Sequence, residues 1–138
     1  MANTQAISVR FKQKSMAAVL DGASIKAALF FNTASLSGTT TSYSATGEAS
    51  GTGYTAGGVV VSNGNAVATS GTTAYWTPSA NIVFPSVTIT TAFDCVQLYV
   101  SATNDCIGTW TIGSQTVTSG TITLTMPTND ASNALIRC

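Results

Sequence analysis

Short runs in which threonine alternates with an apolar residue recur along this 138-residue chain and limit what it can fold into. Residues 86–91 are Ser-Val-Thr-Ile-Thr-Thr, and residues 121–126 are Thr-Ile-Thr-Leu-Thr-Met. Alternation with period two puts the apolar side chains on one face of a β-strand, and β-branched side chains suit a pleated sheet. These runs predict an all-β protein.

Other segments add to this prediction. Residues 26–32 are almost continuously apolar, which predicts a central strand buried on both faces. Alternation over residues 6–12 predicts the first strand, whereas residues 15–22 fit either a single helical turn ending at Gly22 or a loop. Further strands are expected over residues 73–77, 81–84, 93–100, 107–112, 115–118 and 134–137.

A hairpin is expected where residues 58–62 and 66–69 flank Asn63-Gly64-Asn65. About ten short strands without a long helix predict one antiparallel β-sandwich or barrel, jelly-roll-like in architecture. We expect residues 1–26 to form an N-terminal extension that carries the first strand, and residues 27–138 to form the β-sandwich domain.

Charge is scarce: 7% of residues are charged, whereas a soluble domain usually has about 25%. The 24 threonines and 16 serines must therefore keep the surface polar. A surface without long-range repulsion packs easily against other proteins, which favours a role inside an assembly; a secreted β-domain with hydroxyl-rich faces is the alternative.

The N-terminal part of the chain holds most of the positive charge. Arg10, Lys12, Lys14 and Lys26 are four of the five basic residues, and Phe11 lies among them. These are too few for a nucleic-acid arm, whose affinity grows with the number of phosphates neutralised. We expect a solvated or partner-facing edge here.

The sequence offers little for catalysis or metal binding. Without histidine it lacks the usual general base and cannot form Ser-His-Asp or Cys-His arrangements, so we predict no enzyme and no cofactor. Cys95, Cys106 and Cys138 lack zinc-site spacing. We expect Cys95 and Cys106 to be small buried side chains rather than a disulfide, and Cys138 to be free.

Neither a secretory signal nor a membrane span is expected, because no apolar run is long enough for either. The connection over residues 33–58 is long for a compact domain, which is typical of a functional or interface-forming loop. Within it, residues 51–58 resemble a phosphate-binding loop only superficially, since no Lys-Ser or Lys-Thr follows. Its glycines are expected to allow positive φ values and close backbone approach.

Glu48 is the only glutamate in the chain and lies between two tyrosines. We expect its carboxylate to accept hydrogen bonds from loop N–H groups or a tyrosine hydroxyl, and so to hold the loop. The wider pattern is a tyrosine, a glutamate five residues later, Gly-x-Gly-Tyr and a Gly-Gly pair. Its residues are Tyr43, Glu48, Gly51, Gly53, Tyr54, Gly57 and Gly58.

This pattern, together with Asn-Ala-Leu-Ile-Arg at residues 133–137, resembles the capsid decoration (cement) proteins of tailed bacteriophages. The resemblance implies a virion protein made in the host cytoplasm and bound to the outer surface of an icosahedral head. Its expected partners are the major capsid protein and further copies of itself, as a homotrimer, without nucleic acid or membrane. A salt bridge from Glu48 to a capsid Lys or Arg is the alternative role of that carboxylate.

Another function remains open from the sequence. A head-fibre or tail-associated module that binds the host surface would need an exposed aromatic platform, for which Tyr75, Trp76 and Trp110 are candidates. In a β-protein such residues more often belong to the core.

Overall fold

A computed structural model describes residues 3–138 of the chain; residues 1 and 2 of the predicted extension lie outside the described part. The protein is mostly β, with 44% of its residues in strands and one helix in the described range. The all-β prediction is confirmed. The strands form two open antiparallel sheets, so no closed barrel or sandwich is present in residues 3–138.

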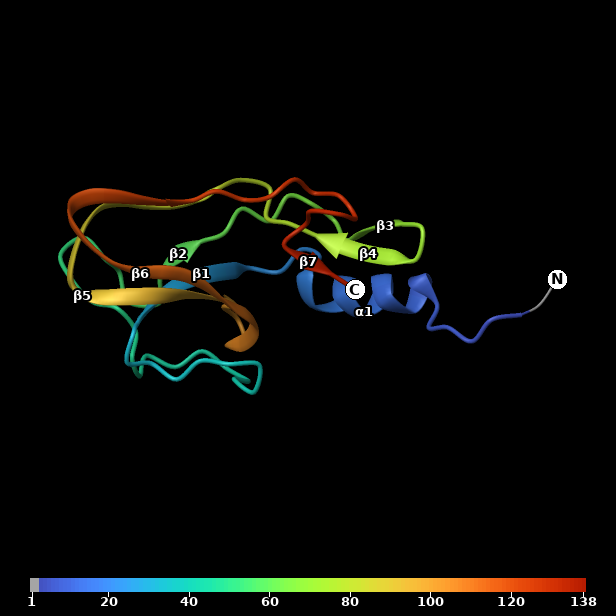
Figure 1. Ribbon diagram of the computed structural model, residues 1–138, viewed down its shortest axis with the longest axis horizontal. Coiled ribbons are helices and arrows are strands. Elements are labelled where there is room, and N and C mark those ends of the chain that lie inside the picture. The colour runs from blue at the N-terminus through green and yellow to red at the C-terminus, as the bar shows by residue number, and fades with distance from the viewer. Residues whose placement is uncertain (1–2) are drawn as a thin grey trace. The chain divides into compact units, whose positions relative to one another are not determined.

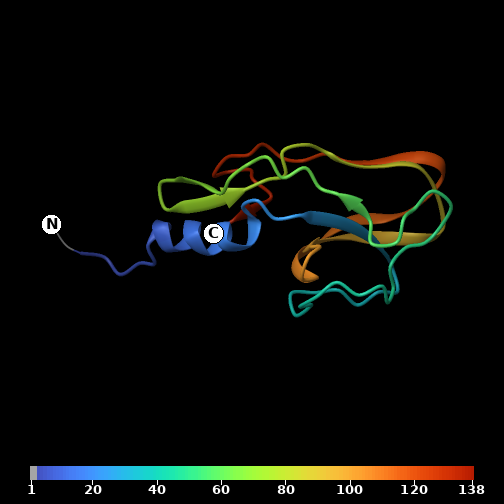
Figure 2. The ribbon, with the colours of Figure 1, turned by 180° about the vertical axis from the view of Figure 1, so that it is seen from behind.

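The chain divides into two compact units, which we describe separately. The helical unit contains described residues 3–23, 63–80 and 126–138, and the sheet unit contains residues 24–62 and 81–125. Figure 1 follows the chain through both units, and Figure 2 shows them from behind. The predicted division of the chain between residues 26 and 27 stays a prediction.

The helical unit consists of helix α1 (Val9–Leu20) and a three-stranded sheet in the order β3-β4-β7. Its strands are β3 (Ala68–Ser70), β4 (Thr73–Trp76) and β7 (Ile136–Arg137). The helix contacts both β3 and β4. Trp76 is completely buried, and its indole N–H donates to the Asn63 side chain and the Asn65 carbonyl.

The predicted first strand over residues 6–12 is wrong, because α1 occupies most of it. The Ser8 side chain caps the helix by accepting from the Arg10 backbone N–H at 3.2 Å. The side chains of Val9, Gln13, Ala17 and Leu20, spaced three or four residues apart, are at least partly buried. This helical spacing competes with the alternation of period two, and packing against β3 and β4 favours the helix.

The sheet unit is a four-stranded antiparallel sheet in the order β2-β1-β5-β6. The strands are β1 (Ile25–Phe31), β2 (Val59–Val60), β5 (Ile82–Val100) and β6 (Asp105–Leu124). Strand β1 is central and almost wholly buried, as its apolar run predicts. The largest fully buried side chains of this unit include Phe30, Phe84, Phe93, Leu29, Ile89 and Leu98.

Seven strands are present in residues 3–138, fewer than the predicted ten. Strands β5 and β6 each span three of the predicted short strands, and they continue across the residues that were expected to form turns between them. Strand β5 passes Pro85 and Ser86 with a register shift between Phe84 and Val87, and Ser86 has a φ of 50°. An irregularity of this kind is where a sheet tolerates proline. The β5–β6 hairpin also turns back on itself (Figure 1).

The hairpin predicted around Asn63-Gly64-Asn65 is also wrong. Strand β2 pairs with β1, while β3 pairs with β4 across a turn at Gly71, whose φ is 59°. Asn63 instead bonds elsewhere, because its side-chain amide donates to the carbonyls of Leu20 and Ala23. Its side chain therefore secures the C-terminal end of α1 rather than a turn.

Candidate functional site

The loop that carries the family-like pattern is organised around the carboxylate of Glu48. We call residues 41–58 the Glu48 loop. Glu48 is only 9% exposed, and its Oε1 accepts from the Tyr43 hydroxyl. Its Oε2 accepts from the Tyr54 hydroxyl at 2.7 Å and from the Gly57 backbone N–H at 2.8 Å. The carboxylate thus joins three points of the loop, as the sequence predicts.

Further contacts tie the same residues to the sheet. The Tyr54 hydroxyl accepts from the Leu29 backbone N–H of β1 at 3.0 Å. The Tyr99 hydroxyl of β5 donates to the Gly57 carbonyl at 2.6 Å, and the Tyr99 and Tyr43 rings stack with centroids 4.3 Å apart. The backbone around Glu48 also pairs with β1, at an isolated bridge to Phe30. The Glu48 loop is therefore held against β1 and β5 and forms an ordered part of the sheet unit.

The glycines of this loop lie where the backbone leaves no room for a side chain. A Cβ on Gly58 would come 1.8 Å from the Ala27 carbonyl oxygen, and the φ of Gly58 is 85°. At Gly51 and Gly53 it would meet the carbonyl oxygens of Thr88 and Ser86 at 1.9 and 2.3 Å. Such distances exclude any side chain unless the backbone moves, so the predicted close approach is confirmed.

Burial shifts the acidity of the tyrosines that surround Glu48. It raises the pKa of the Tyr54 hydroxyl far above its ordinary value, and the hydrogen bond to Glu48 raises it further. The pKa of Tyr43 is raised by the same two causes in the same order. Both hydroxyls therefore stay protonated at neutral pH and can donate to the carboxylate.

This geometry argues against Glu48 as a contact to a partner. Both carboxylate oxygens already accept hydrogen bonds inside the loop, and little of the side chain reaches solvent. A partner's Lys or Arg would have to reach a carboxylate that is 9% exposed and already accepts three hydrogen bonds. The arrangement supports a structural role for the residue.

Four of the five predicted contact residues belong to α1, and three of them are exposed. Phe11 is 66% exposed and has Arg10 and Lys14, both exposed, beside it on the helix. Lys12 turns towards the sheet of the helical unit, where its ammonium donates to the Thr72 carbonyl at 3.1 Å. Lys26 belongs to β1 of the sheet unit and does not join this group.

Sequence reasoning missed two apolar residues that extend this surface. Ile7, just before the helix, is 65% exposed, and Val19 is 48% exposed. Residues 11, 15, 18 and 19 fall on one side of a helix with 3.6 residues per turn, opposite the side that packs on the sheet. A helical rather than alternating interpretation of residues 7–19 would have revealed this outward-facing surface. We call it the α1 outer face. It contains the exposed residues Ile7, Arg10, Phe11, Lys14 and Val19.

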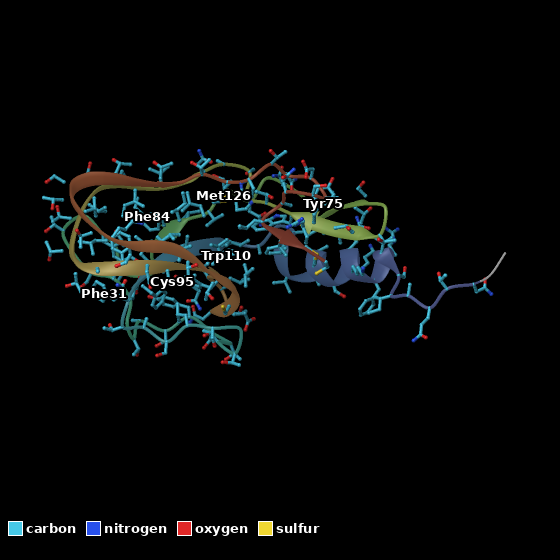
Figure 3. All side chains as sticks on the ribbon, viewed as in Figure 1. Phe31, Tyr75, Phe84, Cys95, Trp110 and Met126 are labelled. Atoms are coloured by element: carbon cyan, nitrogen blue, oxygen red, sulfur yellow. The ribbon has the colours of Figure 1, made fainter. Side chains whose placement is uncertain are left out.

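The aromatic candidates for a binding platform belong to two different units. Trp76 is core, with no exposed surface. Tyr75 and Trp110, both labelled in Figure 3, are half-buried; Tyr75 is part of the helical unit and Trp110 is part of the sheet unit. Trp76 is therefore a core residue, as is more common for aromatic residues in a β-protein, and its indole N–H donates to two buried acceptors.

Residues 3–138 contain no cluster of three or more His, Cys, Asp or Glu side chains that could hold a metal ion. Cys95, Cys106 and Cys138 are free thiols. No helix in the described chain has the length and apolar character needed to cross a membrane. Comparison with protein-family models, curated proteins and solved structures finds no match for this chain.

Proposed function

We propose that this chain is a capsid decoration (cement) protein that binds the outside of an icosahedral phage head and stabilises contacts between major capsid subunits. It acts by adding buried interface, without a reaction. The hydroxyl-rich, charge-poor composition and the resemblance of the Glu48 loop to such proteins support this function.

We propose that the α1 outer face is the surface that contacts the head. Phe11 is 66% exposed and lies on the same side of α1 as Val19, which is 48% exposed, and a group of exposed apolar side chains is typical of an interaction surface. Exposed Arg10 and Lys14 beside it add positive charge to a chain that has little. An apolar anchor with basic neighbours suits an acidic or polar protein surface with a small apolar pocket.

The direct test is co-sedimentation of the purified chain with purified phage heads, followed by counting copies per head. A decoration protein repeats with the icosahedral lattice, so we expect copies in the hundreds at saturation. A dozen copies or fewer would instead indicate a vertex or tail component, including the host-surface binding module that is the alternative. No binding to heads would contradict the proposal.

Point variants locate the contact better than a deletion, because removing residues 1–26 would also remove α1 and its buried Leu20. We expect Phe11→Ser to weaken head binding by about tenfold, the usual effect of losing an apolar anchor. Val60→Ser is the matched control, because Val60 is 75% exposed and lies in the sheet unit. Equal losses in both variants would contradict a contact through α1.

A further inference from the structure

Asn63 is followed by Gly64, and this is the one Asn-Gly pair in the sequence. In such a pair the glycine nitrogen can attack the carboxamide carbon of asparagine, because glycine has no side chain to hinder the approach. The new C–N bond closes a succinimide ring while the bond to the carboxamide nitrogen breaks, and ammonia leaves with the glycine N–H proton. Water then opens the ring at either carbonyl and leaves aspartate or isoaspartate at residue 63. The reaction needs no enzyme, oxidant or cofactor.

Three hydrogen bonds fix the carboxamide of Asn63. Its nitrogen donates to the Leu20 carbonyl at 2.6 Å and to the Ala23 carbonyl at 3.0 Å, at the C-terminal end of α1. Its oxygen accepts from the indole N–H of Trp76 at 3.2 Å, and the Trp76 side chain is completely buried. Because ring closure makes the carboxamide nitrogen the leaving group, both bonds to the end of the helix are lost in the reaction.

The attacking nitrogen also makes a hydrogen bond. The Gly64 backbone N–H donates to the Ser79 hydroxyl at 2.9 Å. The nitrogen must lose this proton to attack, and an N–H in a hydrogen bond gives up its proton slowly, as hydrogen-exchange protection shows. Both reacting residues and all their partners in these bonds belong to the helical unit. An opening of that unit which separates α1 from residues 63–79 therefore frees both reacting groups.

We propose that Asn63 is a deamidation site that the closed helical unit protects, and that reaction there after an opening loosens α1 irreversibly. Aspartate at this position has no N–H for the carbonyls of Leu20 and Ala23, and its negative charge lies against them. Isoaspartate also adds a carbon to the main chain and so moves the Gly64 N–H relative to Ser79. The helical unit then lacks the bonds that secure the end of α1. This inference does not depend on head binding.

The first test compares the rate of deamidation at residue 63 in native buffer and in urea, at the same mildly alkaline pH, by peptide mass spectrometry. A reaction that waits for opening proceeds in proportion to the open fraction, so it should be at least about 100-fold slower in native buffer. Gly64→Ala is the matched control, because its methyl group hinders the attack; it should stay unmodified in urea while wild type reacts. Equal rates for wild type in the two solvents, or equal rates for the two proteins in urea, would overturn the proposal.

The second test measures hydrogen exchange in Asn63→Asp, which reproduces the aspartate product. Loss of both bonds to the end of the helix should raise the exchange rates of α1 amides by about tenfold and leave those of β1 unchanged. Asn32→Asp is the matched control, because it adds the same charge at an exposed residue of the sheet unit; its α1 should exchange as in wild type. Wild-type exchange of α1 in Asn63→Asp, or an equal increase in β1, would overturn the proposal.

Discussion

The Glu48 loop and the α1 outer face use the scarce charge of this chain in opposite ways. In the loop, one carboxylate is turned inward and all its hydrogen bonds stay within the sheet unit. On α1, Arg10 and Lys14 remain in solvent beside an exposed phenylalanine. The difference teaches that the loop pattern, however distinctive in sequence, has a structural role, whereas the less distinctive helix carries the exposed residues on which the proposed head binding depends.

If the loop is architecture, filling its tightest backbone contact should have the largest effect. Gly58→Ala should lower the free energy of unfolding by about 4 kcal/mol, since the new methyl group would overlap the Ala27 carbonyl and separate β2 from β1. Urea unfolding measures this. Gly113→Ala is the matched control: its φ is 81°, but nothing lies within 4 Å of an added Cβ. It should cost about 1 kcal/mol. Equal losses would show that backbone strain, and not close approach, explains the glycine.

Replacing the central carboxylate should have the next largest effect. Glu48→Gln puts an amide donor where two hydroxyls and an N–H already donate, and should cost about 3 kcal/mol. Asp105→Asn alters an exposed carboxylate that accepts from the Thr103 hydroxyl and should change stability by less than about 0.5 kcal/mol. Thermal and urea unfolding would report both. A loss below 1 kcal/mol for Glu48→Gln would mean that the loop is held mainly by its backbone pairing.

Alkaline pH should weaken the loop while leaving the helix face unchanged. The pKa of Tyr54 is raised in the folded chain, so this contribution to stability is complete below the ordinary tyrosine pKa of 10.0 and is lost as the pH rises above it. Between pH 10 and 11, wild type should lose about 1 kcal/mol more than Tyr54→Phe, which cannot ionise there. Parallel pH profiles of urea midpoints would contradict the role of this hydroxyl.

The smallest effect on stability is expected at the α1 outer face. Phe11→Ser exchanges an exposed side chain and should alter the free energy of unfolding by no more than about 0.5 kcal/mol. A loss of more than 1 kcal/mol would show that Phe11 packs within the folded chain and would remove it as a partner contact.

Some of the fold could be predicted because its signals are local. The apolar run of residues 26–32 became the central strand β1, and the role of Glu48 followed from a single carboxylate among tyrosines and glycines. The close approach at Gly58 followed from the same local reasoning. In each case, the residue types allow few alternative environments.

Other features depend on tertiary partners that local patterns do not encode. Residues 6–12 alternate like a strand, yet packing against β3 and β4 favours α1. Pro85 signals a strand end, but pairing with β6 continues β5 past it. The hairpin predicted around Asn63-Gly64-Asn65 does not form because β2 pairs with the central strand β1. The α1 outer face was missed because it exists only if residues 9–20 are helical.

The account assigns a structural role to the Glu48 loop and a binding role to the α1 outer face. The most direct test is the head-binding affinity of Phe11→Ser and of Glu48→Gln, each measured at a temperature where unfolding curves show that the variant is folded. The account predicts that Phe11→Ser keeps wild-type stability and binds about tenfold more weakly, whereas folded Glu48→Gln loses stability and keeps wild-type affinity. The reverse pattern, with binding lost in folded Glu48→Gln and retained in Phe11→Ser, would contradict it.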